Sequence, residues 1–118
     1  ASRTMEINIV KVSDVQIVSL VGRLDLSAAS ILEKSLEDLI TAGDKWILLD
    51  CADLRYVSSS GLGAFIKAAK LLKPAGGKLV FAALNQHVRS VFEMVGFYQI
   101  FESFPSRDEA LESSAFRV

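Results

Sequence analysis

The sequence is poor in the side chains that build metal centres and disulfide frameworks. Of its 118 residues, one is a cysteine and one is a histidine. A single cysteine excludes an internal disulfide, and this inventory cannot supply the ligands of a zinc site. Cys51 stands at the end of a predicted buried strand, so we expect a small core thiol there. We expect His87 to be an exposed polar side chain near the start of a helix. The sequence therefore indicates no metal and no cofactor.

Long apolar runs and an excess of charge are also lacking. The longest apolar runs, residues 46–49 and 79–84, are far too short to cross a bilayer, so no membrane insertion is expected. The net charge of −1 and the isoelectric point near 5.8 give no electrostatic footprint for nucleic acid. No apolar signal segment opens the chain, which makes a cytoplasmic location the expectation. Residues 1–4, ahead of Met5, are set aside as a candidate expression remnant.

The chain does have enough apolar content for one folded domain. Hydrophobic residues make up 51% and charged residues 23% of the sequence, which argues against disorder. We therefore expect residues 1–118 to form a single domain. The hydrophobic periodicity predicts the element order β-β-α-β-α-β-α-β-α. The predicted strands cover residues 5–9, 15–21, 45–51, 78–84 and 98–104. The predicted helices follow Asp25 or Ser27, follow the serines at 58–60, follow Asn85, and cover residues 105–114.

Helices that alternate with buried strands predict an α/β fold. We expect a mixed, mostly parallel sheet of about five strands with about four helices, opened by an antiparallel hairpin. In such sheets functional groups gather outside the carboxyl ends of the strands. Three segments lie where a strand ends and a helix begins, at residues 22–25, 56–61 and 84–87. The sequence therefore predicts that these three segments converge on one surface.

Three consecutive serines and a glycine, Ser58-Ser59-Ser60-Gly61, stand between a predicted buried strand and a predicted helix. Such a junction presents hydroxyls at a helix N-terminus, where free N–H groups and the helix dipole favour negative charge. One serine suffices as an N-cap, which stabilises a helix by about 0.5–2 kcal/mol over alanine. The other two serines have no capping role. Taken in isolation, these residues support a capping role and a phosphorylation site about equally.

A serine hydrolase is the alternative chemistry that a serine at a strand-to-helix turn suggests. Around Ser60 the segment reads Ser-Ser-Ser-Gly-Leu and not G-x-S-x-G. The single candidate base is His87, in a chain with no histidine to spare. Residues 61–63 lack both the G-K-[ST] ending and the G-x-G-x-x-G spacing of phosphate-binding loops. These departures argue against an enzyme.

Several segments together resemble STAS domains of the anti-sigma factor antagonist kind, over nearly the whole chain. Residues 22–25 (Gly-Arg-Leu-Asp) stand for the family's G-E-L-D segment, and residues 48–50 match its apolar strand ending in Asp. Residues 53–63 resemble its D-L-x-x-(hydrophobic)-D-S-S-G-L-G core, and Asn85 opens a segment that ends at residues 96–97 (Gly-Phe). The serine core in this element order is the specific part of the resemblance.

The resemblance implies a partner-switching protein that is a kinase substrate and not itself an enzyme. In the family, the serine just before the glycine is phosphorylated by a partner that is both an anti-sigma factor and a serine kinase. The unphosphorylated antagonist binds that kinase and frees the sigma factor; phosphorylation ends the binding, and a PP2C-type phosphatase resets the cycle. By alignment the phosphoacceptor is Ser60, with Ser59 and Ser58 as fallbacks. The candidate partner surface comprises Arg23, Asp25, Ser59, Gly61, Leu62 and Asn85, of which Asp25 and Asn85 can equally be plain helix caps.

Two positions depart from the family pattern and leave alternatives open. The acidic residue ahead of the serine pair is Ser58 here, and the glutamate after the first glycine is Arg23. These changes fit a kinase of altered charge complementarity, a direct pairing of Arg23 or Arg55 with a phosphate, or a member that is never phosphorylated. The runner-up to the switch is a STAS module that acts as a non-switching scaffold, or as a small subunit docked on a transporter or a larger signalling complex.

Overall fold

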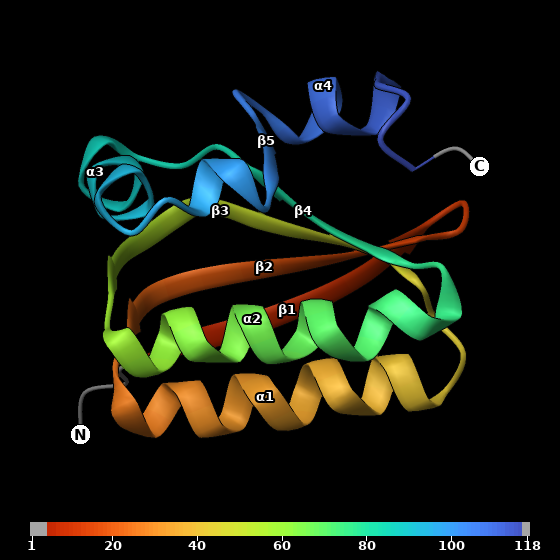
Figure 1. The fold of residues 1–118 in the computed structure, drawn as a ribbon, viewed down its shortest axis with the longest axis horizontal. Coiled ribbons are helices and arrows are strands. Elements are labelled where there is room, and N and C mark those ends of the chain that lie inside the picture. The colour runs from red at the N-terminus through yellow and green to blue at the C-terminus, as the bar shows by residue number, and fades with distance from the viewer. Residues whose placement is uncertain (1–4, 117–118) are drawn as a thin grey trace.

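The computed structural model describes residues 5–116, so the candidate remnant at residues 1–4 lies outside the described residues. In chain order the elements are β1 (Met5–Val12), β2 (Val15–Leu24), α1 (Leu26–Thr41), β3 (Trp46–Val57), α2 (Ser59–Leu72), β4 (Lys78–Ala82), α3 (Gln86–Met94), β5 (Glu102–Phe104) and α4 (Arg107–Glu112). Two short 3₁₀ helices, η1 (Lys73–Ala75) and η2 (Phe97–Gln99), follow α2 and α3. This order confirms the predicted β-β-α-β-α-β-α-β-α pattern (Figure 1).

The strands form one five-stranded sheet in the order β1-β2-β3-β4-β5. β1 and β2 pair antiparallel, from Met5 opposite Gly22 to Val12 opposite Val15. β2 with β3, β3 with β4, and β4 with β5 all pair parallel. The mixed, mostly parallel sheet opened by a hairpin is therefore confirmed. Because β2 to β5 run in one direction, their carboxyl ends meet at the same edge of the sheet.

Helices cover both faces of the sheet. α1 and α2 lie side by side along one face, and α4 lies on the other (Figure 1). The larger apolar cluster fills the space between the sheet and α1, α2 and α3, with Leu32, Phe65 and Phe92 among its fully buried side chains. A smaller cluster joins Val80 of β4 to Ala110 of α4. Burial of these apolar side chains on both faces explains why the central strands read as unbroken apolar runs.

The short helix α4 is tied to the sheet by a charge pair as well as by its apolar side. The guanidinium of Arg107 donates from Nη2 and Nε to Oδ2 of Asp50, at 2.8 and 3.0 Å. Asp50 is buried at the point where the apolar run of β3 ends. The Ser106 hydroxyl accepts from the backbone N–H of Glu109 and caps the helix. A helix of this length is marginal alone, so these contacts hold it in place.

Strands β2 and β3 are longer than the sequence predicts. The predicted strand over residues 45–51 is observed as Trp46–Val57, and the strand predicted to end at residue 21 continues to Leu24. The apolar run ends at Leu49, and the exposed Ala52 and Asp53 interrupt the pattern further on. Pairing nevertheless continues, through register shifts after Ser19 and Gly22, until Leu24 lies opposite Val57. A β-bulge lets a strand resume its pairing beyond a break in its hydrophobic pattern.

The last predicted strand and helix are shorter than predicted. Of residues 98–104 only Glu102–Phe104 pairs as β5, because Gly96, at φ +75°, ends α3 and leads into η2. The strand predicted over residues 78–84 ends at Ala82, since Ala83 adopts φ +60° and leaves the β conformation. The helix predicted over residues 105–114 is observed as Arg107–Glu112.

Cys51 is a buried free thiol on β3, as predicted. Burial raises the pKa of this thiol well above its usual range, and the neighbouring charge of Asp50 raises it further. A thiol in this environment stays protonated and behaves as a small apolar side chain. Across residues 5–116, every helix falls short of the length or the apolar content needed to cross a membrane.

Candidate functional site

Three helices begin at the carboxyl edge of the sheet, and a side chain caps each of them. Oδ1 of Asp25 accepts from the N–H of Ala28 at 3.0 Å at the start of α1. Oγ of Ser58 accepts from the N–H of Gly61 at 3.1 Å at the start of α2. Oδ1 of Asn85 accepts from the N–H of Val88 at 2.9 Å at the start of α3. The three caps come from the three strand-to-helix segments that the sequence predicts to converge.

Backbone and side-chain bonds join the three caps into one surface. The backbone N–H of Ser58 donates to the carbonyl of Leu24, directly before the cap Asp25, at 2.9 Å. The side-chain amide of Asn85 donates to the carbonyl of Leu54 on β3 at 2.6 Å. α1 and α2 begin at the same end of the molecule, with α3 close by (Figure 1). The predicted convergence is thus confirmed. We call the surface formed by residues 22–25, 56–61 and 84–87 the serine edge.

Ser58 is the serine that caps α2. Its backbone is extended at φ −87° and ψ 170°, its hydroxyl accepts from Gly61, and its carbonyl accepts the first helical N–H, from Leu62. An aspartate at this place in the family pattern would cap in the same way, because Asp and Ser are both favoured N-caps. The capping hydrogen bond occupies the Ser58 hydroxyl and leaves the two following serines uncommitted.

Ser59 and Ser60 are the first two residues of α2. The Ser59 side chain is exposed and the Ser60 side chain is half-buried. Within the described part of the chain, neither hydroxyl makes a hydrogen bond. The backbone N–H groups at these first positions have no partner inside a helix and carry part of its positive end. A negative group carried on either hydroxyl would therefore be stabilised by the helix.

The electrostatics of the serine edge favour negative charge at three helix ends at once. α1, α2 and α3 each have no acidic side chain in the first turn. The usual stabilisation of a helix N-terminus by Asp or Glu is therefore supplied here only by the cap Asp25 on α1. The second helix is left with a neutral cap, so its positive end is available to a phosphate.

Gly61 allows α2 to start against the sheet. It is buried, and a Cβ built on it would lie 2.6 Å from Cγ of Leu24 and 2.9 Å from Cγ2 of Val57. No side chain fits there without a shift of β2, β3 or the helix. Leu62, the next residue, is half-buried and packs against the main core cluster. These two residues fix the height and orientation at which Ser59 and Ser60 are presented.

Gly61→Ala is expected to destabilise the protein by about 1–3 kcal/mol, because the added methyl overpacks the junction of Leu24 and Val57. The matched control is Gly63→Ala, two residues further along the same helix, where a Cβ meets nothing within 4 Å. This control is expected to stabilise the protein by about 0.5–1 kcal/mol through helix propensity. Urea denaturation measures both changes. Equal effects of the two substitutions would contradict the close approach described for Gly61.

An arginine, a tyrosine and the only histidine form a stack on the same edge. The guanidinium carbon of Arg23 lies 4.3 Å from the centroid of the Tyr56 ring. The rings of Tyr56 and His87 stack with centroids 6.2 Å apart and an interplanar angle of 16°. Arg23 lies opposite Tyr56 in the β2–β3 register, and His87 comes from the first turn of α3. Stacking on an aromatic face orients the arginine and restrains it.

Of these three side chains only Arg23 is a predicted site residue, and no pattern in the sequence indicates Tyr56 and His87 as its neighbours. His87 is exposed, as predicted, and its ring packs on Tyr56. Ser27, named with Asp25 as a cap of the first helix, lies instead inside the first turn of α1. The structure thus brings Arg23, Asp25, the serines, Gly61 and Asn85 to one edge and adds an aromatic platform to them.

The chain belongs to the STAS domain family, whose sequence model matches residues 6–110. BtrV of Bordetella bronchiseptica, a protein assigned as an anti-sigma factor antagonist, is 35% identical over 114 residues, which cover 97% of this chain and 97% of BtrV. The anti-sigma-B factor antagonist of Bacillus subtilis is 33% identical over 91 residues, which cover 76% of this chain and 81% of that protein.

Solved structures agree with the fold. A structure of an anti-sigma factor antagonist assigned in Thermotoga maritima matches with a TM-score of 0.86 at 23% identity, over 90% of this chain and 92% of that one. SpoIIAA, a Bacillus cell fate determinant solved in its phosphorylated form, matches with a TM-score of 0.74 at 20% identity, over 91% and 97% of the two chains. At these identities the likeness shows the fold alone, whereas the match of the family model to residues 6–110 confirms the resemblance to a STAS domain.

Proposed function

We propose that this protein is a cytoplasmic anti-sigma factor antagonist that works as a partner switch, controlled by phosphorylation of Ser60. In the unmodified form its serine edge binds an anti-sigma factor that is also a serine kinase, and the sigma factor is released. Two relatives with identity above 30%, BtrV and the Bacillus subtilis protein, are named as anti-sigma factor antagonists, which supports this role. A PP2C-type phosphatase would return the modified protein to its binding form.

The observation that carries the proposal is the position of Ser60 in the second place of α2, at a positive helix end with a neutral cap. A phosphoserine carries about −1.5 to −2 charges near neutral pH and three strong acceptor oxygens. The unpaired N–H groups at the helix start can donate hydrogen bonds to those oxygens without any change of fold. Ser58 is occupied as the cap, which favours Ser60 and Ser59 over Ser58 as acceptors.

The proposed chemistry belongs to the partner. The kinase binds ATP, and the Ser60 oxygen attacks its γ-phosphorus, giving a phosphate ester and ADP while the hydroxyl proton passes to a base of the kinase. The phosphatase returns the hydroxyl by hydrolysis of that ester and releases inorganic phosphate. The antagonist itself supplies a nucleophile on a rigid helix end, held in position by the close packing of Gly61 on Leu24 and Val57.

Arg23, which replaces the family's glutamate, adds a positive charge to the surface of this protein that binds the partner. Arg23 is restrained on Tyr56, close to the strand end that hydrogen-bonds Ser58. A positive group here favours a kinase whose facing surface is acidic. The replacement of glutamate by Arg23 is then matched by a kinase with a more acidic binding surface, and the switching mechanism stays the same.

A kinase assay on serine variants tests the proposal. The kinase is isolated from the native cells by affinity capture on the unmodified protein and incubated with ATP and each variant. Ser60→Ala is expected to abolish phosphate incorporation, and Ser59→Ala to preserve it. For Ser58 the informative variant is Ser58→Asp, because aspartate removes the hydroxyl and keeps the cap. Incorporation that survives Ser60→Ala and is lost in Ser59→Ala or Ser58→Asp would move the site; incorporation into none of the proteins would favour a non-switching scaffold.

A further inference from the structure

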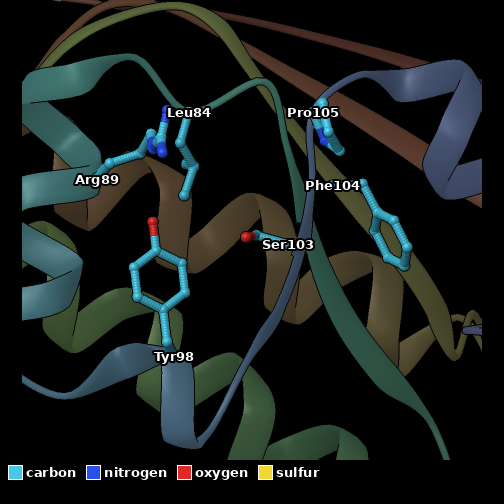
Figure 2. A pocket seen from close by; sticks show the side chains of 6 residues that line it. All are labelled: Leu84, Arg89, Tyr98, Ser103, Phe104 and Pro105. Carbon is cyan, nitrogen blue, oxygen red and sulfur yellow. The ribbon is translucent and has the colours of Figure 1, made fainter.

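A pocket of about 370 Å³ lies at the carboxyl end of β4 and β5, and its lining does not include Ser58, Ser59 or Ser60. It is bounded by the segment after β4, by α3, by η2 and by the end of β5. Figure 2 shows the side chains that line it, which are Leu84, Arg89, Tyr98, Ser103, Phe104 and Pro105. The carboxyl edge of parallel strands is where open α/β sheets place ligands. This volume is at the lower end of the range for small-molecule sites.

Three polar side chains meet in this pocket, and the ring of one of them, Tyr98, also packs against Phe92 with centroids 6.0 Å apart. Arg89 comes from α3, Tyr98 from η2 and Ser103 from β5, and their polar ends point into the same space (Figure 2). Over residues 5–116, the guanidinium of Arg89 makes no ion pair, and the Tyr98 and Ser103 hydroxyls make no hydrogen bond. Arg89 is also the only charged residue among those that line the pocket. Convergent donors around one positive charge favour an anion.

The remaining walls of the pocket are apolar and are fixed by the backbone. Leu84 and Pro105 contribute side chains without polar atoms, whereas the ring of Phe104 lies on the other side of β5 and packs against the smaller apolar cluster (Figure 2). The backbone N–H of Ala83 donates to the carbonyl of Phe104 at 2.9 Å, which joins the two rims. Ala83 itself adopts φ +60°, a left-handed conformation that alanine rarely takes. Such a conformation persists where surrounding contacts hold it, so the rim is a built feature.

We propose that this pocket binds a small organic anion whose phosphate or carboxylate pairs with Arg89 and whose apolar or aromatic body lies against Leu84 and the ring of Tyr98. The Tyr98 and Ser103 hydroxyls donate to the anionic group or to a neighbouring oxygen of the ligand. This proposal does not depend on the proposed switch, although the pocket adjoins the serine edge, because its lining residue Leu84 directly precedes the cap Asn85. Helix α3 links the two, since it carries Arg89 and is capped by Asn85.

The test is a titration of the ¹⁵N-labelled full chain followed by NMR, with four defined probes. Phenyl phosphate and benzoate combine an anion with an aromatic body. Inorganic phosphate carries the charge alone, and benzyl alcohol carries the aromatic body alone. We expect saturable shifts at the residues of the pocket, in the millimolar range that is normal for ligands of this size. Phenyl phosphate or benzoate is expected to bind at least about tenfold more tightly than either half-probe, since both halves of the site contribute.

Two variants and one control locate the site. Arg89→Gln removes the guanidinium with its charge and is expected to weaken binding of the aromatic anions by about tenfold or more. Tyr98→Phe removes only the hydroxyl and is expected to weaken that binding by about threefold. The control is Arg55→Gln, an exposed arginine on β3, which is expected to leave the affinity unchanged. Shifts confined to Ser59 and Ser60, affinity unaffected by Arg89→Gln, equal binding of benzyl alcohol, or no saturable shift would each overturn the proposal.

Discussion

Ser60→Asp is expected to weaken binding to the partner kinase by about 100-fold or more, a loss of about 2.7 kcal/mol. The substitution places a fixed negative charge on the second residue of α2, in the middle of the proposed binding surface. In the complex the carboxylate would lose its hydration against the partner's surface. We expect no positive group of the partner to lie opposite it, because the partner binds a neutral serine there. Ser60→Ala removes only the hydroxyl and is expected to keep the affinity of the unmodified protein.

The matched control for this prediction is Ser60→Asn, which has nearly the shape of aspartate and no charge. It is expected to stay within about threefold of the unmodified protein, so that the difference between Asn and Asp isolates the charge. A carboxylate in the first turn of a helix is stabilising by about 0.3–1 kcal/mol, so the Asp variant is expected to be folded. Thermal denaturation checks this, and isothermal calorimetry with the kinase measures the affinities. Equal affinities of the Asp and Asn variants would exclude electrostatic control by Ser60.

Phe81→Ala is expected to lower the free energy of unfolding by about 3–5 kcal/mol. Phe81 on β4 is fully buried. Its ring centroid lies 4.9 Å from that of Phe65 on α2, 5.0 Å from Phe92 on α3 and 5.1 Å from Phe101. Alanine leaves a cavity at the centre of this cluster and removes three edge-to-face contacts.

The control for the core prediction is Ile100→Ala, at an apolar residue that is 64% exposed just before the cluster's Phe101. It is expected to change stability by no more than about 0.5 kcal/mol. Urea denaturation midpoints report both variants. A loss below about 1 kcal/mol for Phe81→Ala would show that the aromatic cluster does not hold α2 and α3 on the sheet. Those two helices carry Ser60 and Asn85, so the cluster supports the serine edge from behind.

Much of the fold follows from local patterns. The apolar run at residues 46–49 predicts a buried central strand, and Ile47 to Leu49 are indeed fully buried. Asp25, Asn85 and one of the three serines act as the predicted caps. These features depend on neighbours in the chain, so sequence periodicity and capping chemistry are sufficient to find them.

The strand ends were harder to predict, because they depend on distant partners. β3 continues past Cys51 only because β2 remains beside it through two register shifts. β5 is limited to three residues because Gly96 and η2 redirect the chain ahead of it. Hydrophobic periodicity within one strand shows neither how far a neighbouring strand stays paired with it nor where a turn redirects the chain. It predicts the existence of an element better than its boundaries.

At the serine edge and in the pocket beside Arg89, too, the features that depend on neighbours in the chain are predictable and those that depend on distant partners are not. Topology alone predicts that three strand-to-helix junctions meet, and hydrogen bonds from Ser58 to Leu24 and from Asn85 to Leu54 confirm it. The stack of Arg23, Tyr56 and His87 depends on cross-strand register and side-chain direction, which no spacing in the sequence encodes. The pocket beside Arg89 likewise depends on where η2 places Tyr98, in a segment that the sequence predicts as a strand.

The central claim is that Ser60 is phosphorylated in the cell, and one peptide tests it directly. Trypsin cleaves after Arg55 and Lys67 and releases residues 56–67, which contain Ser58, Ser59 and Ser60 together. The protein is isolated from its native cells under several growth and stress conditions, and this peptide is sequenced by fragmentation mass spectrometry. We predict a phosphate localised to Ser60, in a fraction that changes with conditions. A peptide that remains unmodified throughout would contradict the switch and leave a binding scaffold as the function of this STAS domain.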